Sequence, residues 1–455
     1  MAMFSAAAWM ATIVAAVAVA FMGLLEEAGA CPHDPEACFF SADYYSARAR
    51  FREAAVGANA TLHRLHISAE LDLTIDVAVL SSGVGEDAAT LVHMSGAHGV
   101  EAYAGSAVQL ALLRQWASQP PRGVRVVLVH VLNPYGFHCG RRFNEDNIDL
   151  CRNVLDDDEF AAIRDDERKT LYDEHEWLFN MRQGWTPVLD DFKFAIRMLY
   201  ASSVVGTLTF RRSIAAGQYH APEGLFYGGG PTMARSHALL LPLLRRIATP
   251  ASAAIIIDVH TGLGPQGVDT IIPPFPPRDA ASAAANARAI HAIFGGPQAA
   301  EVRACAPSSD GGSKADVLGI DFLIEAPTID EAKHVSAGYE LTRGSTESPD
   351  GYTARIGSAG WARTLAVCQE FGTWTAPLVL RAMIIEAAEW LHRRDDAEST
   401  AWAGCHGSAF GARAARDAFY VRRASWQRAV VRRGVRLAEA AVHALIDKPT
   451  LVPTV

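Results

Sequence analysis

The sequence predicts an α/β fold in which one wound, mixed sheet is flanked by helices on both faces. Short apolar runs typical of buried strands alternate with longer stretches whose apolar residues recur at helical spacing. Several of these runs end in Gly-containing turns. Neither an internal repeat nor a clear linker divides the chain after residue 39. We therefore expect a single domain over residues 39–455.

The elements of the first half follow from local patterns. Residues 71–79 alternate apolar and polar side chains, as a half-buried strand does, and 124–132 is a continuous apolar run that fits a strand buried on both faces. Residues 90–94 form a short apolar strand that leads into a Gly-punctuated turn. Residues 41–58 and 101–116 carry apolar positions at helical spacing and are expected to be helices.

The second half begins with a different composition. Residues 156–191 are dense in Asp, Glu and Arg, which predicts surface helices and a charged helical insertion extending to about 205. Residues 253–259 and 363–371 are expected to be buried strands, and the proline-rich residues 273–277 a loop. Two further helices are expected, at 377–393 and 424–446.

The N-terminal 38 residues are expected to lie outside the fold. Residues 4–25 are 22 positions without a charge, a length that suits a signal sequence or a membrane-spanning helix. We expect a secreted or membrane-anchored protein that contacts a membrane through this segment, with a cytoplasmic protein as the alternative. The net charge of -9 argues against a general nucleic-acid binder.

The chain contains seven cysteines, so at least one of them has no partner within it. Cys31 and Cys38 are close enough in sequence to form a disulfide bond if the chain is exported. The other cysteines lie in apolar or motif segments, and we expect buried thiols there.

A metal site is predicted at the ends of two strands. His98 and Glu101 follow the strand at 90–94 and open a helix, which places both side chains at the carboxyl edge of the sheet. His260 follows the strand at 253–259 and precedes a Thr-Gly turn. A catalytic zinc ion takes three protein ligands and keeps one position open, so these three residues form a plausible set for one zinc ion. The alternative for His260 is a hydrogen-bonded structural imidazole.

Other polar residues supply candidate catalytic and substrate-binding groups. Glu370 ends the strand at 363–371 and is a candidate general base, with a buried ion pair to Arg363 as the alternative. Arg142 and Arg152 follow the strand at 124–132, and arginine binds a substrate carboxylate through two parallel hydrogen bonds. The alternative is ordinary pairing with acidic residues of the same loop, such as Asp149.

Several enzyme classes are disfavoured by missing motifs. No serine has glycine at both the minus-two and plus-two positions, so the nucleophile elbow of serine hydrolases is absent. The His-Glu-x-x-His helix of thermolysin-like proteases and the Gly-Lys-Ser/Thr phosphate loop are absent as well.

The combined motifs resemble the carboxypeptidase A-like zinc peptidase superfamily, and more closely its branch called domain of unknown function 2817. The resemblance spans about residues 39–446. It is carried by motif segments in a fixed order: 95–101, 132–137, 141–153, 217–219, 224–229, 258–264 and 370–373.

By this resemblance, His98, Glu101 and His260 hold one zinc ion and Glu370 is the general base. Arg142 and Arg152 bind the substrate carboxylate, with Arg142 also assigned to catalysis. The chain departs from the family pattern at one substrate-binding position, where Cys151 stands in place of the expected asparagine. A thiol is a poor substitute for the amide group of asparagine as a hydrogen-bond donor.

The function implied by the resemblance is zinc-dependent hydrolysis of an amide next to a carboxylate-bearing group, as in a metallocarboxypeptidase. The substrate would be a peptide or an N-acyl amino acid with a free carboxylate. The alternatives are an aspartoacylase-like deacylase of N-acyl amino acids and a non-catalytic binding module that retains the fold. The sequence does not indicate an oligomeric state.

Overall fold

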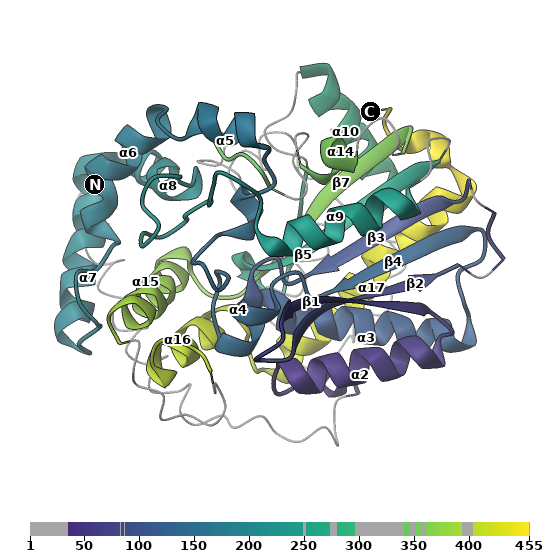
Figure 1. Cartoon of the computed structure of the whole chain (residues 1–455), viewed down its shortest axis with the longest axis horizontal. Helices are drawn as coiled ribbons and strands as arrows, with labels where there is room; N and C mark the ends of the chain where they lie inside the picture. The colour runs from purple at the N-terminus through teal and green to yellow at the C-terminus, as the bar shows by residue number, and fades with distance from the viewer. Residues whose placement is uncertain are drawn as a thin grey trace, which may run out of the picture.

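The computed structural model describes residues 35–81, 83–85, 87–248, 252–273, 280–295, 341–345, 351–356, 361–393 and 404–454. Within these ranges, a mixed seven-stranded sheet with the order β1-β2-β4-β3-β5-β7-β6 crosses the molecule (Figure 1). Its strands are β1 (Thr61–Ser68), β2 (Leu73–Leu80), β3 (Ala89–Ser95), β4 (Val124–His130), β5 (Ala253–Gln266), β6 (Asp269–Ile272) and β7 (Arg363–Gly372).

The centre of the sheet is parallel and its margins are antiparallel. β3 pairs in parallel with β4 and β5, and β5 pairs in parallel with β7. β1, β2 and β6 join through antiparallel pairs. The carboxyl ends of β3, β4, β5 and β7 therefore meet at one edge, where open α/β sheets bind ligands. The predicted α/β fold with a mixed sheet is confirmed.

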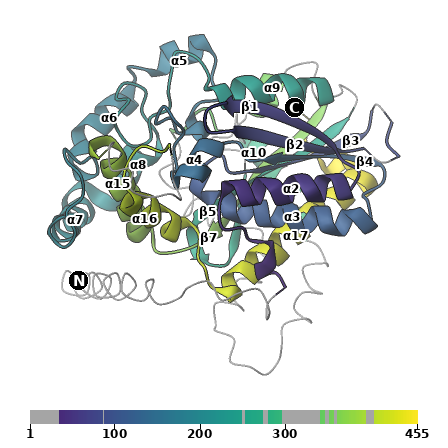
Figure 2. The same cartoon turned by 60° about the horizontal axis from the view of Figure 1, so that its bottom comes forward.

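Helices cover both faces of the sheet (Figures 1 and 2). One face packs against α2 (Tyr44–Gly57), α3 (Ala102–Ser118), α10 (Ala280–Phe294) and α17 (Ala424–Asp447). The other packs against α9 (Arg235–Ile247) and α14 (Tyr352–Ile356). The inner strands are almost fully buried, and all eight residues of β2 have little exposure to solvent, whereas the edge strand β1 is partly exposed. This rigid core fixes the strand ends that carry the candidate site.

A helical layer lies beyond the carboxyl edge of the parallel strands (Figure 1). It contains α4 (Pro134–Cys139), α5 (Asp157–Ile163), α6 (Glu167–His175), α7 (Leu189–Tyr200), α8 (Thr207–Ala215), α15 (Ala376–His392) and α16 (Ala409–Phe419). Helices were predicted for 156–191, and the structure places α5, α6 and the start of α7 there. The buried side chains of α7, α8, α15 and α16 form a separate apolar cluster beside the sheet. This layer supplies one wall of the cavity described below.

The sequence patterns did not reveal every element. The strands β1 and β6 and the helices α4, α8, α9, α10, α14 and α16 were not predicted, and β5 continues for seven residues past the predicted end at residue 259. β1 is an edge strand with a weakly buried pattern, so its apolar alternation is faint. β6 has only four residues and depends on antiparallel pairing with β7. Short and marginal strands depend on tertiary pairing that a local pattern does not show.

The expected localisation requires correction. No helix in the described ranges is both long enough and apolar enough to cross a membrane. This finding goes against the expectation of a secreted or membrane-anchored protein, which we withdraw. Residues 4–25, which gave rise to it, lie outside the described ranges.

The expectation of buried thiols was wrong for two cysteines. Cys139 at the end of α4 forms a disulfide bond with Cys405, 266 positions later in the chain. The two residues are far apart in sequence, so their spacing gave no indication of the pairing. Cys151 and Cys368 are buried thiols, as expected. Cys31 lies outside the described residues, and its pairing with Cys38 stays a prediction.

Candidate metal centre

The loops after β3 and β4 are locked together by backbone contacts. Leu132 and Asn133 donate their backbone N–H groups to the carbonyls of Ser95 and Gly96, at 2.9 Å and 2.8 Å. Gly96 has a φ of +66°, which glycine adopts without strain. A Cβ atom on Gly99 would lie 2.0 Å from the backbone of Gly136, so this close approach requires glycine. These contacts hold the residues that follow β3 against the loop after β4.

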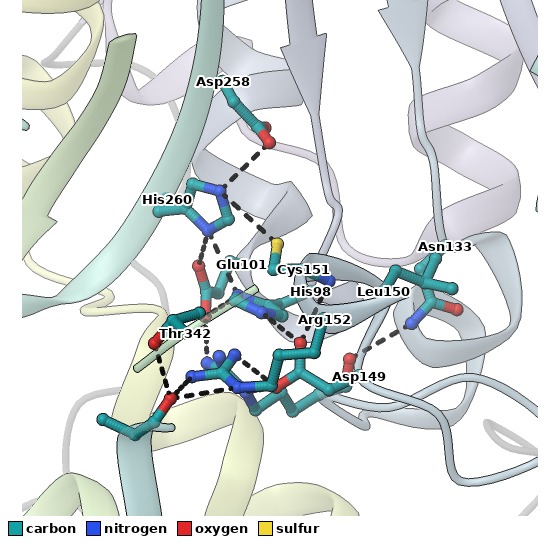
Figure 3. Close-up of polar contacts among 12 residues, drawn as sticks. His98, Glu101, Asn133, Asp149, Leu150, Cys151, Arg152, Asp258, His260 and Thr342 are labelled. Carbon is teal, nitrogen blue, oxygen red and sulfur yellow. Dashed lines mark hydrogen bonds and ion pairs between the residues drawn. The ribbon is translucent and has the colours of Figure 1, made fainter. Parts of the chain in front are cut away.

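His98, Glu101 and His260 converge at the carboxyl edge of the sheet (Figure 3). The Nδ1 atoms of His98 and His260 are 3.1 Å apart. Glu101 places Oε1 2.9 Å from the first Nδ1 atom and Oε2 3.0 Å from the second. All three side chains are buried. Two segments whose residues are up to 162 positions apart in sequence thus bring their donor atoms to one point.

The spacing of these donor atoms fits a tetrahedral zinc site. Zinc–nitrogen and zinc–oxygen bonds of about 2.0–2.1 Å at tetrahedral angles place ligand atoms about 3.4 Å apart. The observed separations of 2.9–3.1 Å require each ligand atom to move outward by only a few tenths of an ångström. The arrangement can therefore accept an ion through side-chain adjustment alone.

The formal charge of the surrounding cluster also favours a cation. Its carboxylates are Glu101, Asp149, Asp258 and Glu370, and its guanidinium groups are Arg142 and Arg152. With neutral imidazoles, four negative and two positive charges leave a formal charge of −2 in a buried site. Uncompensated buried charge is costly, and one divalent cation would bring the sum to zero.

Each imidazole is oriented by a second carboxylate. The Nε2 atom of His98 lies 3.1 Å from Oδ1 of Asp149, and Nε2 of His260 lies 3.2 Å from Oδ2 of Asp258. Metal-binding histidines commonly donate their distal N–H to such groups, which fixes the ring and makes the ligand nitrogen more basic. Burial lowers the pKa of His98, but the acidic groups around it outweigh burial and raise the pKa to about 10. The pocket between the rings therefore attracts positive charge.

Glu370 lies beside this cluster on β7, in register with His260 on the neighbouring strand β5. Its Oε1 accepts a hydrogen bond from the backbone N–H of Leu263 at 2.7 Å. Arg363 donates instead to the carbonyl of Val452, so the alternative ion pair with Glu370 is not formed. Burial and the nearby charge of Glu101 raise the pKa of Glu370 to about 7. A carboxylate with that pKa can exchange protons near neutral pH.

The arginines occupy three different environments. Arg142 lines the cavity and donates to Oε1 of Glu101 at 3.0 Å and to Oδ2 of Asp149 at 3.2 Å. Arg152 is 2% exposed and donates to the same Asp149 oxygen at 2.9 Å, with its other donors on the carbonyl of Ala215. Arg141 turns away from the cavity and pairs with Glu386. The pairing with Asp149, considered as an alternative, is thus present for both candidate arginines.

A cavity of about 570 Å³ opens over these groups. One part of its wall is polar and is formed by His98, Glu101, Arg142, Arg152, His260 and Glu370, and Cys151 borders both imidazoles there. Apolar side chains from the helical layer form much of the remainder, among them Phe210, Ile214, Val379, Leu380 and Met383. The volume is in the range of sites that bind small organic ligands.

Asp149 and Asp258 are the residues of the site whose roles were not recognised from the sequence. Asp149 had been considered only as a partner for arginine, whereas it also contacts His98. Asp258 stands two positions before His260, and alternate residues of a strand share one face of the sheet. That spacing is the sequence signal that could have identified it.

Solved structures with detectable similarity include carboxypeptidase A of Helicoverpa armigera, at 12% identity over 88% of this chain and 74% of that chain, with a TM-score of 0.42. A protein of Shewanella denitrificans OS217, provisionally named a metallopeptidase, is 16% identical over 76% of this chain and 87% of that one, with a TM-score of 0.30. A protein of Shewanella amazonensis SB2B, provisionally assigned to the succinylglutamate desuccinylase/aspartoacylase family, is 17% identical over 72% and 70%, with a TM-score of 0.28. These similarities are too distant to assign an activity.

No curated protein matches the sequence of the chain. A family model does match, over residues 40–309 and 327–433. Those ranges cover most of the chain and include every residue of the metal centre described above. The chain belongs to the family Protein of unknown function (DUF2817).

Proposed function

We propose that this protein is a zinc-dependent hydrolase that cleaves an amide bond next to a carboxylate-bearing group, in the manner of a metallocarboxypeptidase. The observation that supports the proposal most directly is the meeting of His98, Glu101 and His260: the two Nδ1 atoms are 3.1 Å apart, and each lies within 3.0 Å of one carboxylate oxygen of Glu101. Glu370 lies against the same buried cluster and borders the same cavity.

His98 and His260 would bind the ion through Nδ1 and Glu101 through its carboxylate. When bound, zinc at such a position supplies Lewis acidity, which polarises a carbonyl and lowers the pKa of water. Asp149 and Asp258 would keep the distal nitrogens of the two rings protonated, so that each Nδ1 lone pair faces the ion.

Glu370 would act as the general base. Its carboxylate takes a proton from the attacking water and delivers it to the leaving nitrogen, as a group with a pKa near neutrality can do in both directions. The hydrogen bond from Leu263 to Oε1 fixes the side chain, which lines the cavity, and Oε2 lies 4.0 Å from Sγ of Cys368. Position and protonation are thus both suited to proton transfer.

Arg142 would orient the substrate carboxylate, because its guanidinium lines the cavity beside Glu101. Arg152 is committed to Asp149 and the carbonyl of Ala215. Its contribution would be indirect, since it holds the carboxylate that in turn holds His98. We keep Arg152 as a proposed substrate-binding residue only in this supporting sense.

Deacylation of N-acyl amino acids is the second candidate function. The extensive apolar wall formed by α8 and α15 favours it, because such a surface suits an acyl chain. An apolar peptide side chain would fit the same wall, so substrate tests must decide. A non-catalytic binding module remains the third reading, in which the ion binds and no turnover occurs.

The test is a substrate panel on the purified full chain loaded with zinc. Short peptides, the same peptides with an amidated C-terminus, and N-acyl amino acids are assayed side by side. The proposal expects zinc-dependent release of a C-terminal amino acid and little cleavage of the amidated peptides. Preference for N-acyl amino acids would favour the deacylase. Stoichiometric zinc without turnover on any of these would favour the binding module.

A further inference from the structure

Cys151 places a thiol in the wall of the metal centre. It lies in a short 3-10 turn, Leu150–Arg152, whose start is capped by Asp149. Oδ1 of that carboxylate accepts from the backbone N–H of Cys151 at 3.1 Å and lies 3.1 Å from Nε2 of His98. The same group therefore positions the cysteine backbone and one of the proposed metal ligands. The thiol is 5% exposed and borders the cavity.

The sulfur is close to both imidazoles (Figure 3). Sγ of Cys151 is 4.0 Å from Nε2 of His260, the ring nitrogen that also contacts Asp258, and one possible ligand atom from each of His98, Cys151 and His260 lies within 4.8 Å of the other two. Zinc bonds of about 2.3 Å to sulfur and about 2.0–2.1 Å to nitrogen place such atoms about 3.6 Å apart at tetrahedral angles. Coordination of the same ion by Nδ1 of His260 and by the thiolate therefore requires the Cys151 side chain to move toward the Nδ1 edge of that ring.

We propose that Cys151 is a metal ligand of this chain and that its thiolate coordinates the ion held by His98 and His260. Thiolate sulfur is among the preferred ligands of zinc and of other borderline-soft divalent ions. Coordination forms the metal–sulfur bond and releases the thiol proton to solvent. The inference rests on the metal centre of the proposed function.

A sulfur ligand is compatible with hydrolysis. Catalytic zinc can expand to five ligands, so a thiolate beside His98, Glu101 and His260 need not exclude a substrate carbonyl. The thiolate would give the ion in this chain a different set of ligands from that in a chain with asparagine at position 151. Because sulfur ligands change the spectrum of a bound transition metal, the two sets can be distinguished without measuring activity.

Cys368 provides a matched control within the same cavity. It is also a buried, cavity-lining thiol, with Sγ 4.0 Å from Oε2 of Glu370. It does not belong to the group of three ligand atoms formed by Cys151 and the two histidines. Substitution of either cysteine removes one sulfur atom from the cavity wall, but only substitution of Cys151 is expected to alter the ligands of the metal.

The experiment is a cobalt titration of the full chain after its metal has been removed with a chelator. Cobalt(II) chloride is added, and the near-ultraviolet spectrum is recorded for sulfur-to-cobalt charge transfer while the visible bands report bound cobalt. The native chain and Cys368→Ser are expected to show the charge-transfer band. Cys151→Asn and Cys151→Ser are expected to lose it while they still bind cobalt.

Two outcomes would overturn the inference: bound cobalt in the native chain without the charge-transfer band, or a band that survives in Cys151→Asn. Failure of the proposed hydrolysis is separable from both. A charge-transfer band without amide cleavage supports the sulfur ligand and contradicts the catalytic proposal. Amide cleavage without the band supports the catalytic proposal and contradicts the sulfur ligand. A native chain that binds no cobalt would remove the metal centre and this inference together.

Discussion

Replacement of Glu370 by glutamine isolates the general base from the rest of the centre. Glutamine has nearly the same shape, and its amide oxygen can still accept the 2.7 Å hydrogen bond from the backbone of Leu263. The substitution removes the only feature that proton transfer needs, which is the titratable carboxylate. None of the three proposed metal ligands is altered, so the ion should remain bound.

The magnitude follows from the role assigned to this carboxylate. A positioned general base typically contributes a factor of about 10² to 10⁴, which corresponds to about 3–5 kcal/mol of the activation free energy. We expect kcat/KM for the best substrate of the panel to fall by that factor in Glu370→Gln. Zinc content, measured by mass spectrometry of the dialysed protein, should stay near one ion per chain.

The control for this variant is Glu439→Gln, which makes the same chemical change on α17, where the carboxylate contacts Gln115 away from the cavity. It should leave kcat/KM and zinc content unchanged. Activity of Glu370→Gln within about tenfold of the native chain would refute the assignment of the base. Loss of zinc from the same variant would show instead that Glu370 helps to bind the ion.

Three further outcomes are expected. Asp149→Asn should weaken zinc binding by about 10- to 100-fold, because the group that orients the His98 ring loses its charge. Competition with a chelator measures the affinity for zinc, and an unchanged affinity would contradict the role of Asp149. The kcat/KM of the loaded protein should fall as pH drops through an apparent pKa at or below about 7, because Glu370 must be deprotonated to act and the bound cation favours its charged form. A profile that rises on acidification would exclude this base. Removal of zinc should lower the midpoint of thermal unfolding by a few degrees, since an ion present at about 100 times its dissociation constant stabilises the fold by about 2.7 kcal/mol. An unchanged unfolding midpoint in a calorimetric scan would argue against a bound ion.

Much of the candidate site was predictable because its residues stand at the ends of strongly apolar strands. His98 follows β3, His260 lies on β5 and Glu370 on β7, and parallel strands deliver their carboxyl ends to a common edge. The long central strands were recognised from composition alone. The topology then placed these residues together, although they are far apart in sequence.

Other features depend on tertiary contacts that no local pattern contains. The disulfide bond between Cys139 and Cys405 joins segments 266 positions apart. The sharing of Asp149 among His98, Arg142 and Arg152 arises because two loops pack at hydrogen-bond distance. Sequence reasoning had treated carboxylate binding and pairing with Asp149 as exclusive alternatives for these arginines, whereas the structure shows the pairing inside the candidate site itself.

The convergence of two imidazoles and one carboxylate on a single divalent ion is tested most directly by the zinc content of His260→Ala. That side chain comes from β5 and lies 159 positions from Glu101, so it contributes to metal binding only if the fold brings the two segments together. We expect about one zinc ion per native chain and almost none in His260→Ala after dialysis at equal free zinc. Equal zinc content in the two proteins, or no zinc in the native chain, would contradict the account.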